Sequence, residues 1–451
     1  MEQTKPKKSG RTLFALGLGY LIDQGEGQAM GVLSPILMSL WGISYSAIGL
    51  METLRNIAQT ISAPFWGYAS DRWSRKKVLI FGTGVWGLWT VAVGLVPDIF
   101  SMTIIRTISG LGLGCLMPAT FSLLGDHYPQ SQRGRALGVI GAVGAIGIVI
   151  GVLALGFVAT PELWRWGFIG LGIASIISGL IIWWLVEEPL RGSAEPELAG
   201  LVTRETEKRY MINWKDVFST LRIPTVWAAI LQGVTGSMPW VVMGIYLINW
   251  MVKDLGFSNT ITFSDTRGSA PLVFALIVVG TAISNYAGGV IGDYAEKKSP
   301  KYGRTIIGQF SVFVGVPLTY ILFTQGKNMS FMGILALAFG TALLISWPGR
   351  GAKEPMMQAI VPPEMRSSAY SVVALIEGGL SAFSGLIAGA LADKIGLTNA
   401  LLWTVPFPWI LCGIGFTLFY FTYPRDAARV RARMAERRDE LLAEQAAGQP
   451  Q

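Results

Sequence analysis

Long apolar runs dominate this sequence and restrict the folds that it can adopt. Runs of about 20 residues alternate with short polar connections between residues 12 and 422. A helix of about 20 apolar residues crosses the hydrocarbon of a bilayer, where only helices and closed barrels satisfy their own main-chain hydrogen bonds. Of the 451 residues, 51% are hydrophobic and 14% are charged. The sequence is too apolar for a soluble chain of this length and predicts an all-α membrane protein.

We expect twelve transmembrane helices, which cover residues 12–38, 46–70, 78–96, 100–126, 134–158, 166–187, 224–252, 270–292, 304–324, 329–359, 367–392 and 398–422. Five cations lie on the connections of one side, namely Arg165, Lys253, Arg267, Lys327 and Lys394. Arg55 and Arg106 lie inside spans, so 29 of the 36 Lys and Arg residues are left for the other side. Because cytoplasmic loops are rich in Lys and Arg, this asymmetry predicts a multi-pass protein of the cell (inner) membrane with both termini in the cytoplasm.

The widest polar connection, residues 188–223, divides the chain into two halves. We expect one six-helix bundle in residues 12–187 and a second in 224–422, with cytoplasmic tails at 1–11 and 423–451. In the linker, Trp214, Val217, Phe218 and Leu221 recur with helical spacing, which predicts a short helix in the membrane interface. The arginine-rich tail after Pro424 predicts contact with anionic membrane lipid.

The remaining composition argues against an enzyme, a metalloprotein and a nucleic-acid-binding protein. Cys115 and Cys412 fall inside apolar runs, and His127 is the only histidine. The sequence contains no evident nucleophile–base pair or metal-ligand set, so we expect no catalytic activity, metal or cofactor. Its glycine runs have the three- and four-residue spacing of close helix packing rather than the context of a phosphate-binding loop. The net charge of +8 comes from cations in short loops, which does not indicate nucleic acid as a partner.

Ionisable residues inside spans are candidates for function, because a charge in hydrocarbon is unfavourable by several kcal/mol. Asp23 lies about eleven residues into the first span, and Glu26 lies one turn further on the same face. Glu52 and Arg55 are three residues apart in the second span, and Arg106 enters the fourth span at a similar depth. These residues predict one charged cluster, in which burial and like charge favour a protonated carboxylate and hence proton coupling. A fully paired structural network is the alternative.

The second half carries fewer ionisable residues inside its spans. Glu377 is the one acid of the eleventh span and is a candidate for a second protonation or cation site. Arg350, Lys353 and Glu354 lie in the inner part of the tenth span. They either take part in function or mark the end of the span, and the sequence leaves both readings open.

Glycine and proline are frequent in the seventh span between Gln232 and Trp240. Broken helices at the membrane midplane often line substrate sites, which makes Gln232, Trp240, Tyr246 and Asn249 candidates for a substrate pocket. The alternative is a kink that serves helix packing.

A charged turn from Gly67 to Lys77 separates the second and third spans. Gly67, Asp71, Arg72, Arg75 and Lys76 have the spacing Gly-x-x-x-Asp-Arg/Lys-x-x-Arg/Lys-Lys/Arg, which resembles the signature between the second and third helices of the major facilitator superfamily. Gly289 to Asp293 repeats the start of this pattern 222 residues after the first copy. The resemblance implies two pseudo-symmetric bundles of six helices, and it implies that the turn and Asp293 belong to a cytoplasmic gate.

Two further stretches refine the resemblance. Arg106-x-x-x-Gly110-x-Gly112-x-Gly114 is similar to the fourth-helix motif of proton-coupled members, and residues 20–23 and 232–240 are similar to the Spinster-like and anion:cation-symporter groups. The resemblance implies a secondary active transporter that moves a small organic solute, anionic or amphipathic, together with protons by alternating access. We expect it to act as a monomer. The alternatives are a proton-driven exporter of lipophilic compounds or lysolipids and a non-transporting membrane sensor.

Overall fold

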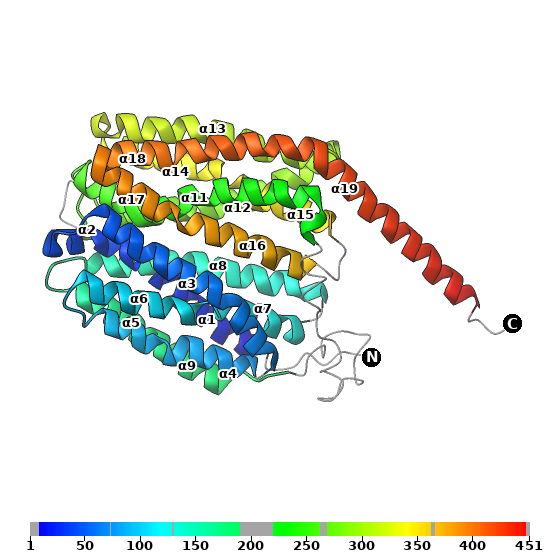
Figure 1. Ribbon diagram of the computed structural model, residues 1–451, viewed down its shortest axis with the longest axis horizontal. Coiled ribbons are helices and arrows are strands. Elements are labelled where there is room, and N and C mark those ends of the chain that lie inside the picture. The colour runs from blue at the N-terminus through cyan, green and yellow to red at the C-terminus, as the bar shows by residue number, and fades with distance from the viewer. Residues whose placement is uncertain are drawn as a thin grey trace.

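The computed structural model describes residues 9–72, 74–128, 130–189, 220–261, 268–361 and 366–447. The described chain is almost wholly helical, and its helices form two bundles that lie side by side (Figure 1). The chain enters and leaves at the same end of the molecule, which we call the terminal end; the other is the opposite end. This architecture confirms the predicted all-α fold with twelve transmembrane helices in two pseudo-symmetric bundles of six.

The N-terminal bundle, blue to cyan-green in Figure 1, has six spans, of which three are built from more than one helix. In chain order these are α1 (Ser9–Glu26) with α2 (Ala29–Trp41); α3 (Tyr45–Arg72); α4 (Arg75–Leu79) with the π-helix η1 (Ile80–Val85) and α5 (Gly87–Val93); α6 (Ile99–Leu113) with α7 (Leu116–His127); α8 (Gln130–Phe157); and α9 (Trp164–Leu185).

The C-terminal bundle, green to red in Figure 1, follows after a 3-10 turn, η4 (Thr220–Arg222). Its spans are α11 (Pro224–Lys253); α12 (Ala270–Lys298); α13 (Gly303–Gln325) with η5 (Gly326–Asn328); α14 (Phe331–Ile345) with the π-helix η6 (Pro348–Lys353) and α15 (Glu354–Ala359); α16 (Arg366–Ala382) with α17 (Ser384–Ile395); and α18 (Leu397–Thr404) with α19 (Pro406–Ala447). Trp214, Val217 and Phe218 of the expected interfacial helix lie outside the described residues.

The structure decides between the two readings that the sequence left open for the seventh span. This span is the single helix α11 with Pro239 inside it, so its glycine and proline residues do not break it. A proline in a helix removes its own hydrogen bond to the fourth preceding carbonyl and crowds that carbonyl, which can kink a helix without ending it. Within the described residues the breaks occur in other spans: at Gly27 and Gln28 between α1 and α2, at Gly114 and Cys115 between α6 and α7, at Phe383 between α16 and α17, at Val405 between α18 and α19, and beside the two π-helices.

Nine of the described helical stretches are long and apolar enough to cross a membrane by length and composition alone. They correspond to the fourth to twelfth spans. The first three are not among them: α1 contains Arg11, Asp23 and Glu26, α3 contains Glu52, Arg55, Asp71 and Arg72, and the third span consists of short pieces. Polarity is therefore concentrated in the first half of the N-terminal bundle.

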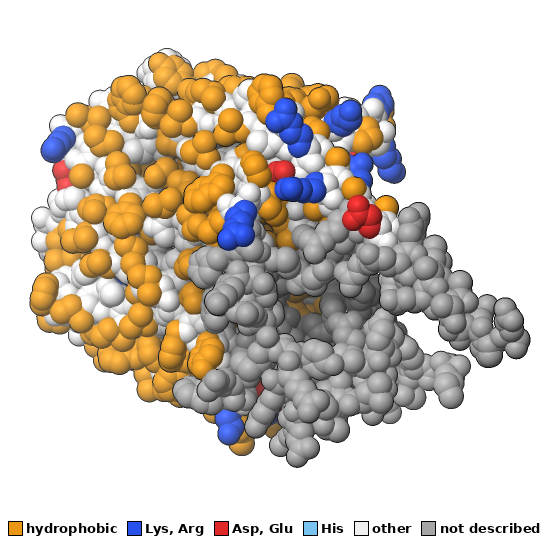
Figure 2. All heavy atoms as spheres, turned by 45° about the vertical axis from the view of Figure 1, so that its right-hand side comes forward, with side chains coloured by type: hydrophobic (Ala, Val, Ile, Leu, Met, Phe, Trp, Pro, Cys, Tyr) orange, Lys and Arg blue, Asp and Glu red, His pale blue; other side chains and the backbone are white. Residues whose placement is uncertain are grey.

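The surface agrees with this placement in a membrane. Figure 2 shows a flank covered by hydrophobic side chains, while most of the visible Lys and Arg side chains gather towards the terminal end. Large exposed apolar residues, among them Trp184 and Phe100, are 78% and 72% exposed. Hydrocarbon rather than water is the solvent in which such a flank is stable.

Glycines allow the first and fifth spans to approach closely. A Cβ atom on Gly147 would overlap the main chain of Leu21, and one on Gly151 would overlap Gly25. The α1–α8 pair is among the most extensive helix contacts in the molecule. This packing agrees with the prediction that the fifth-span glycines serve helix contact, because small residues let helices associate in lipid.

The two bundles are joined by hydrogen bonds in the half nearer the opposite end. The carboxylate of Asp393, near the end of α17, accepts hydrogen bonds from the main-chain N–H groups of Tyr45 (2.8 Å) and Ser46 (2.9 Å) at the start of α3. The Tyr246 hydroxyl lies between the carbonyl oxygens of Tyr45 (2.9 Å) and Gly385 (3.0 Å) and can donate to either. Asn249 donates to the Ser34 hydroxyl at 2.5 Å. These contacts close the opposite end.

We predict that Asp393→Asn weakens this closure. The amide keeps one acceptor oxygen but loses the charge that favours a carboxylate at a helix N-terminus, a change of about 1 kcal/mol. That energy shifts the ratio of closed to open molecules about fivefold. Pulsed electron paramagnetic resonance between spin labels at positions 162 and 328, on the opposite ends of the two bundles, should then show a larger fraction of long distances.

Asp98→Asn is the matched control for this experiment. Asp98 is also an exposed acid at the opposite end, but it caps α6 of its own bundle by accepting from the Ser101 N–H at 2.9 Å. This local hydrogen bond holds the pKa of Asp98 below its usual value. An unchanged distance distribution in Asp393→Asn, or an equal change in both variants, contradicts the assigned role of Asp393.

Candidate functional site

An ion pair between Glu52 and Arg106 lies in the interior of the N-terminal bundle. Both the Nε and the Nη2 atoms of Arg106 donate to Glu52 Oε1, at 3.0 and 2.6 Å. Arg106 is 1% exposed and Glu52 is 4% exposed, so water contributes little to either charge. Removing one member of such a pair leaves an uncompensated charge at low dielectric. The pair therefore acts as one unit.

The close approach of α3 and α6 positions this pair. Gly110 lies one turn after Arg106, and a Cβ atom at this position would overlap the carbonyl oxygen of Arg55. The missing side chain lets the two helices touch, which brings Arg106 within reach of Glu52. The guanidinium of Arg106 also lies over the ring of Phe168, 5.6 Å from its centroid.

Arg55 and two further acids complete a group of five ionisable side chains, which we call the five-charge cluster: Asp23, Glu26, Glu52, Arg55 and Arg106. The closest Arg55–Glu52 approach is 3.9 Å, and the Arg55 Nε has no hydrogen-bond partner among the described residues. Glu26 is buried and accepts from the Thr90 hydroxyl at 2.9 Å, and Asp23 accepts from the Gln24 amide at 3.1 Å. Glu26 and Arg55 are close enough to act electrostatically on Asp23.

The structure thus brings together the five residues that the sequence placed at similar depth. Three carboxylates face two guanidinium groups, so the cluster has one more acid than base. Arg106 and Glu52 are fully engaged with each other, whereas Asp23 is only half-buried and its described partner is the uncharged Gln24. A proton on one carboxylate balances the charge, and Asp23 and Glu26 are the acids without an ion-pair partner among the described contacts.

A second internal ion pair, between Lys353 and Glu377, lies in the C-terminal bundle. The Lys353 ammonium donates to both carboxylate oxygens of Glu377, at 3.0 and 2.8 Å. The sequence singled out Glu377 but left the part of Lys353 open. Arg350 pairs with Glu354 at 2.9 Å on the same short stretch, and its side chain is 65% exposed. The lone acid of a span needs a counter-charge, and a cation at similar depth is the sequence signal that identifies it.

The four candidates for a substrate pocket occupy different surroundings. Gln232 is buried and donates to the Cys412 sulfur at 3.2 Å, while its Oε1 atom has no partner among the described residues. Trp240 packs edge-to-face against Trp409, with 5.6 Å between ring centroids. Tyr246 and Asn249 are fully buried in the contacts between the bundles described above. The structure does not bring the four into one group.

At the terminal end, Arg75 is the centre of a polar network. It is 1% exposed, although it lies in a strongly charged turn. Its guanidinium pairs with Asp126 and Glu188 and donates to the Pro189 carbonyl oxygen at 2.7 Å. The Arg75 N–H donates to Glu188 at 2.7 Å. Arg75 therefore joins the start of the third span to the ends of the fourth and sixth.

The other members of the expected gate are placed less closely. Lys76 is half-buried, and the side chains of Asp71 and Arg72 lie outside the described residues. A Cβ atom on Gly67 would come no closer than 4.0 Å to the described atoms around it, so this glycine meets no close neighbour. Asp293 pairs with Arg304 at 2.5 Å in the second half. Arg304 also binds Glu296 at 2.7 Å and the Gly351 carbonyl oxygen at 3.0 Å.

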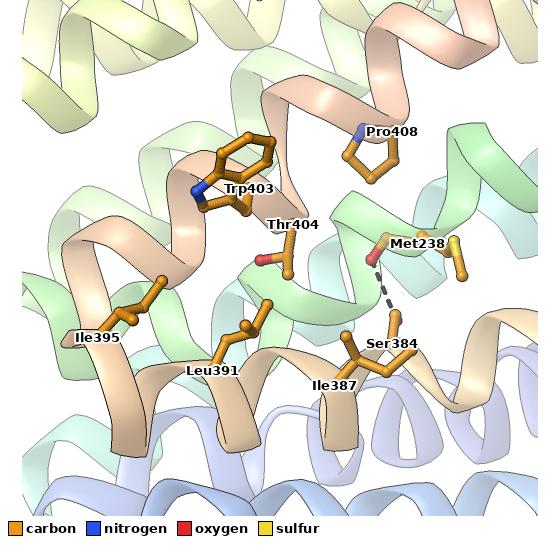
Figure 3. Close-up of a pocket in the computed structure, with 8 residues that line it drawn as sticks. All are labelled: Met238, Ser384, Ile387, Leu391, Ile395, Trp403, Thr404 and Pro408. Atoms are coloured by element: carbon orange, nitrogen blue, oxygen red, sulfur yellow. Dashed lines mark hydrogen bonds between the residues drawn. The ribbon is translucent and has the colours of Figure 1, made fainter.

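An apolar groove with a volume of about 430 Å³ lies on the C-terminal bundle between α11, α17 and the α18–α19 break (Figure 3). Ser384 donates to the Met238 carbonyl oxygen at 3.3 Å within it. Trp403 and Ile387, which line the groove, are 60% and 48% exposed. None of its lining residues is ionisable, so the groove suits hydrocarbon rather than a charged solute. The lining residues are Met238, Ser384, Ile387, Leu391, Ile395, Trp403, Thr404 and Pro408.

The cysteines and acidic side chains of the described residues form no further site. Cys115 and Cys412 are both free and buried. Within the described ranges, no three His, Cys, Asp or Glu side chains are placed to hold a metal ion.

Paired six-helix bundles with charged side chains in their interior define the architecture of a membrane transporter. The family model of the Major Facilitator Superfamily matches residues 16–353, and the chain belongs to this superfamily. The mouse protein spinster homolog 3 is 25% identical over 420 residues, 86% of this chain and 78% of that protein. The Escherichia coli (strain K12) 3-(3-hydroxy-phenyl)propionate transporter is 24% identical over 398 residues, 86% and 89% of the two chains.

Two solved structures have the same fold. A bacterial homolog of the human lysosomal transporter Spinster, in an inward-facing and unoccupied conformation, aligns with a TM-score of 0.74 at 18% identity and covers 95% of this chain and 99% of its own. A D-xylose-proton symporter aligns with a TM-score of 0.67 at 16% identity, covering 92% and 97%. Two of these proteins are named as transporters of organic solutes, 3-(3-hydroxy-phenyl)propionate and D-xylose, so the superfamily to which this chain belongs includes transporters of such solutes.

We predict that Glu52 and Arg106 behave as one unit in stability measurements. Glu52→Gln and Arg106→Met should each reduce the free energy of unfolding by about 3 kcal/mol or more, because each leaves a buried charge without its partner. The double variant should be more stable than either single variant. Thermal unfolding of the purified protein in detergent measures all three.

Lys327→Met is the matched control, since it removes a cation whose side chain is 55% exposed and pairs with Asp254 at 3.3 Å. Exposed pairs contribute about 0–1 kcal/mol, so this variant should unfold close to the parent temperature. Additive losses in the Glu52 and Arg106 double variant contradict the prediction.

A second prediction compares two neighbouring cations of the charged turn. Arg75→Gln should lower the unfolding temperature by several degrees, because it removes several charge-assisted hydrogen bonds from a buried position, each contributing about 1.5–3 kcal/mol. Lys76→Gln should change it by about one degree or less, since Lys76 is half-buried and lies in the same turn. Equal effects in the two variants contradict the central position of Arg75.

Proposed function

We propose that the protein is a secondary active transporter that moves a small organic solute, anionic or amphipathic, together with protons. The observation that carries this proposal is the five-charge cluster. Buried ionisable side chains in transmembrane helices are unfavourable by several kcal/mol and usually mark the paths of ions, protons or solutes. An excess of one carboxylate gives the cluster a reason to bind and release a proton.

The contact pattern between the bundles supports transport by alternating access. In our proposal the terminal end faces the cytoplasm, as the distribution of Lys and Arg indicates. The hydrogen bonds at Tyr45, Tyr246 and Asn249 then close the outer side, and we assign this closure to an inward-facing conformation. For the outward-facing conformation we assign closure of the cytoplasmic side to the turn that contains Asp71. When one bundle rocks against the other, the outer side opens as the cytoplasmic side closes, and the reverse motion restores the first state.

The relatives support an organic solute and, less directly, proton coupling. One relative is named for transport of 3-(3-hydroxy-phenyl)propionate, which is a carboxylate, and one structural neighbour is named as a proton symporter. The cation at Lys353, whose side chain is 16% exposed inside the C-terminal bundle, favours an anionic group on the solute. A second candidate function is export of lipophilic compounds. The apolar groove of Figure 3 favours it, because an acyl chain fits a groove without ionisable residues.

The proposal is tested with purified protein in liposomes. A library of radiolabelled organic acids should contain a solute whose uptake rises at least tenfold when the outside is made acidic. Asp23→Asn, Glu26→Gln and Glu52→Gln should each reduce this pH-driven uptake to about a tenth or less. At least one of the amide variants should still exchange external for internal solute, since exchange needs no net proton movement.

Glu162→Gln is the control, because Glu162 is an exposed acid outside the cluster. It should leave both uptake and exchange unchanged. Full pH-driven uptake in all three amide variants rules out the cluster as the proton site. Uptake that no pH gradient alters, for every solute of the library, rules out proton coupling.

A further inference from the structure

The Lys353–Glu377 pair has the form of an anion site that is occupied by a side chain of the protein itself. We propose that the Lys353 ammonium binds the carboxylate group of the transported solute, and that Glu377 occupies this position when no solute is bound. The inference rests on the proposed transport function and specifies its substrate class, a small organic carboxylate.

The geometry of the pair is that of a bound carboxylate. Lys353 Nζ donates to both oxygens of Glu377, and the two side chains are 16% and 14% exposed. These exposed fractions are larger than those of a fully buried ion pair and smaller than those of a surface ion pair. Arg106 and Glu52, by comparison, are 1% and 5% exposed at their side chains. The Lys353 ammonium is therefore the internal cation that a solute can reach with the least rearrangement.

The surrounding helices hold both partners in place. A Cβ atom on Gly233 of α11 would overlap the carboxylate of Glu377, so the acid lies in a notch that a glycine provides. Lys353 is the last residue of the π-helix η6, which is fixed by the hydrogen bond from Arg304 Nη1 to the Gly351 carbonyl oxygen at 3.0 Å. A rigid support of this kind keeps the ammonium in position when its partner changes.

The residue after Glu377 places the pair close to the other bundle, since a Cβ atom on Gly378 of α16 would lie 3.5 Å from the Thr60 hydroxyl of α3. Arg350, three residues before Lys353, is close enough to act electrostatically on Tyr20 of α1, and so is Tyr370 of α16. Tyr20 belongs to the N-terminal bundle, so these side chains border the space between the two bundles.

The charges around the pair make an exchange of carboxylates possible. Arg350 is already paired with Glu354, which leaves Glu377 as the described carboxylate bound to Lys353. Glu354 is the other carboxylate close enough to act on Glu377, and its charge is balanced by Arg350. The remaining polar groups near Glu377 are neutral: the Tyr370 hydroxyl on α16, the Cys412 thiol on α19, and on α3 the Thr60 hydroxyl beside Gly378. None of them can replace the negative charge.

This arrangement couples one proton to one anion. When Glu377 takes up a proton, the ammonium loses its counter-charge in a region of low dielectric, which is unfavourable. Binding of a solute carboxylate restores the charge balance. Release of the solute leaves the ammonium unpaired until Glu377 loses its proton. The buried Oε1 atom of Gln232, next to Gly233, has no donor among the described residues and is available to a hydroxyl group of the solute or of protonated Glu377.

The test measures binding of carboxylates to purified protein by calorimetry. The probes are benzoate, glucuronate and 3-(3-hydroxyphenyl)propionate, each compared with its amide. Glu377→Gln should bind at least one carboxylate tenfold more tightly than the parent protein, because the amide leaves the ammonium free, and should not bind the corresponding amide. Adding Lys353→Met to this variant should abolish the gain. Arg350→Met, which removes the more exposed cation, should retain it.

A second measurement covers a Glu377 variant that fails to fold. Carboxylate binding to the parent protein, measured in buffers of different ionisation enthalpy, should take up about one proton per ligand. No carboxylate binding in either protein, binding without proton uptake, or a gain that survives Lys353→Met overturns the inference. pH-driven uptake of a neutral solute that Lys353→Met leaves intact overturns it as well, while the transporter proposal stands. If carboxylates bind as expected but no solute is transported, the inference about Lys353 stands and the transporter proposal is overturned.

Discussion

A charge inside a bilayer is stable only beside its counter-charge, and this condition accounts for much of the arrangement of this protein. Arg106 of α6 reaches Glu52 of α3, and Lys353 of η6 reaches Glu377 of α16. Each pair joins two different helical segments, and a glycine makes room for it: Gly110 lets α6 approach α3 beside Arg106, and Gly233 of α11 leaves the space that the Glu377 carboxylate occupies. The same attraction that stabilises the pairs also makes them sensitive to protonation, because neutralising one acid leaves an unpaired cation. Structure and proposed mechanism therefore depend on the same few side chains.

In each half of the chain, one arginine at the terminal end binds several acceptors, and the acidic residues that it binds differ between the halves. Arg75 lies at the start of the third span and Arg304 at the start of the ninth, 229 residues later. Arg75 binds Asp126 and Glu188, while Arg304 binds Asp293 and Glu296 of the preceding helix and the Gly351 carbonyl oxygen of the following span. In both halves one guanidinium ties together neighbouring spans, since a planar fork with five donors can serve several acceptors at once. The common element is the position of the cation, whereas the acceptors differ.

The closure of the opposite end uses a carboxylate and a helix N-terminus. Asp393 near the end of α17 binds the first N–H groups of α3, and Asp71 lies at the other end of the same helix α3. The residues around Asp393 read Gly389-x-x-x-Asp393-Lys394, which repeats the Gly-x-x-x-Asp start of the charged turn at Gly67. This repeat is a sequence signal for Asp393, but reading it requires knowing that α3 and α17 meet. A carboxylate at a helix N-terminus is a contact of moderate strength that can form and break as bundles move.

The sequence alone determined the membrane class, the number and order of the spans, the two pseudo-symmetric halves and the depth of the charged residues, because length and polarity along one helix decide whether and where it crosses hydrocarbon. It also placed the five-charge cluster, since residues at equal depth in neighbouring spans can meet. Only the tertiary structure decided which charges pair, that Lys353 rather than Arg350 binds Glu377, and that Tyr246 and Asn249 lie in the contact between the bundles. It also decided that α11 is continuous through Pro239. Hydropathy does not show which face of a helix contacts which neighbouring helix. That choice depends on side-chain packing between segments hundreds of residues apart.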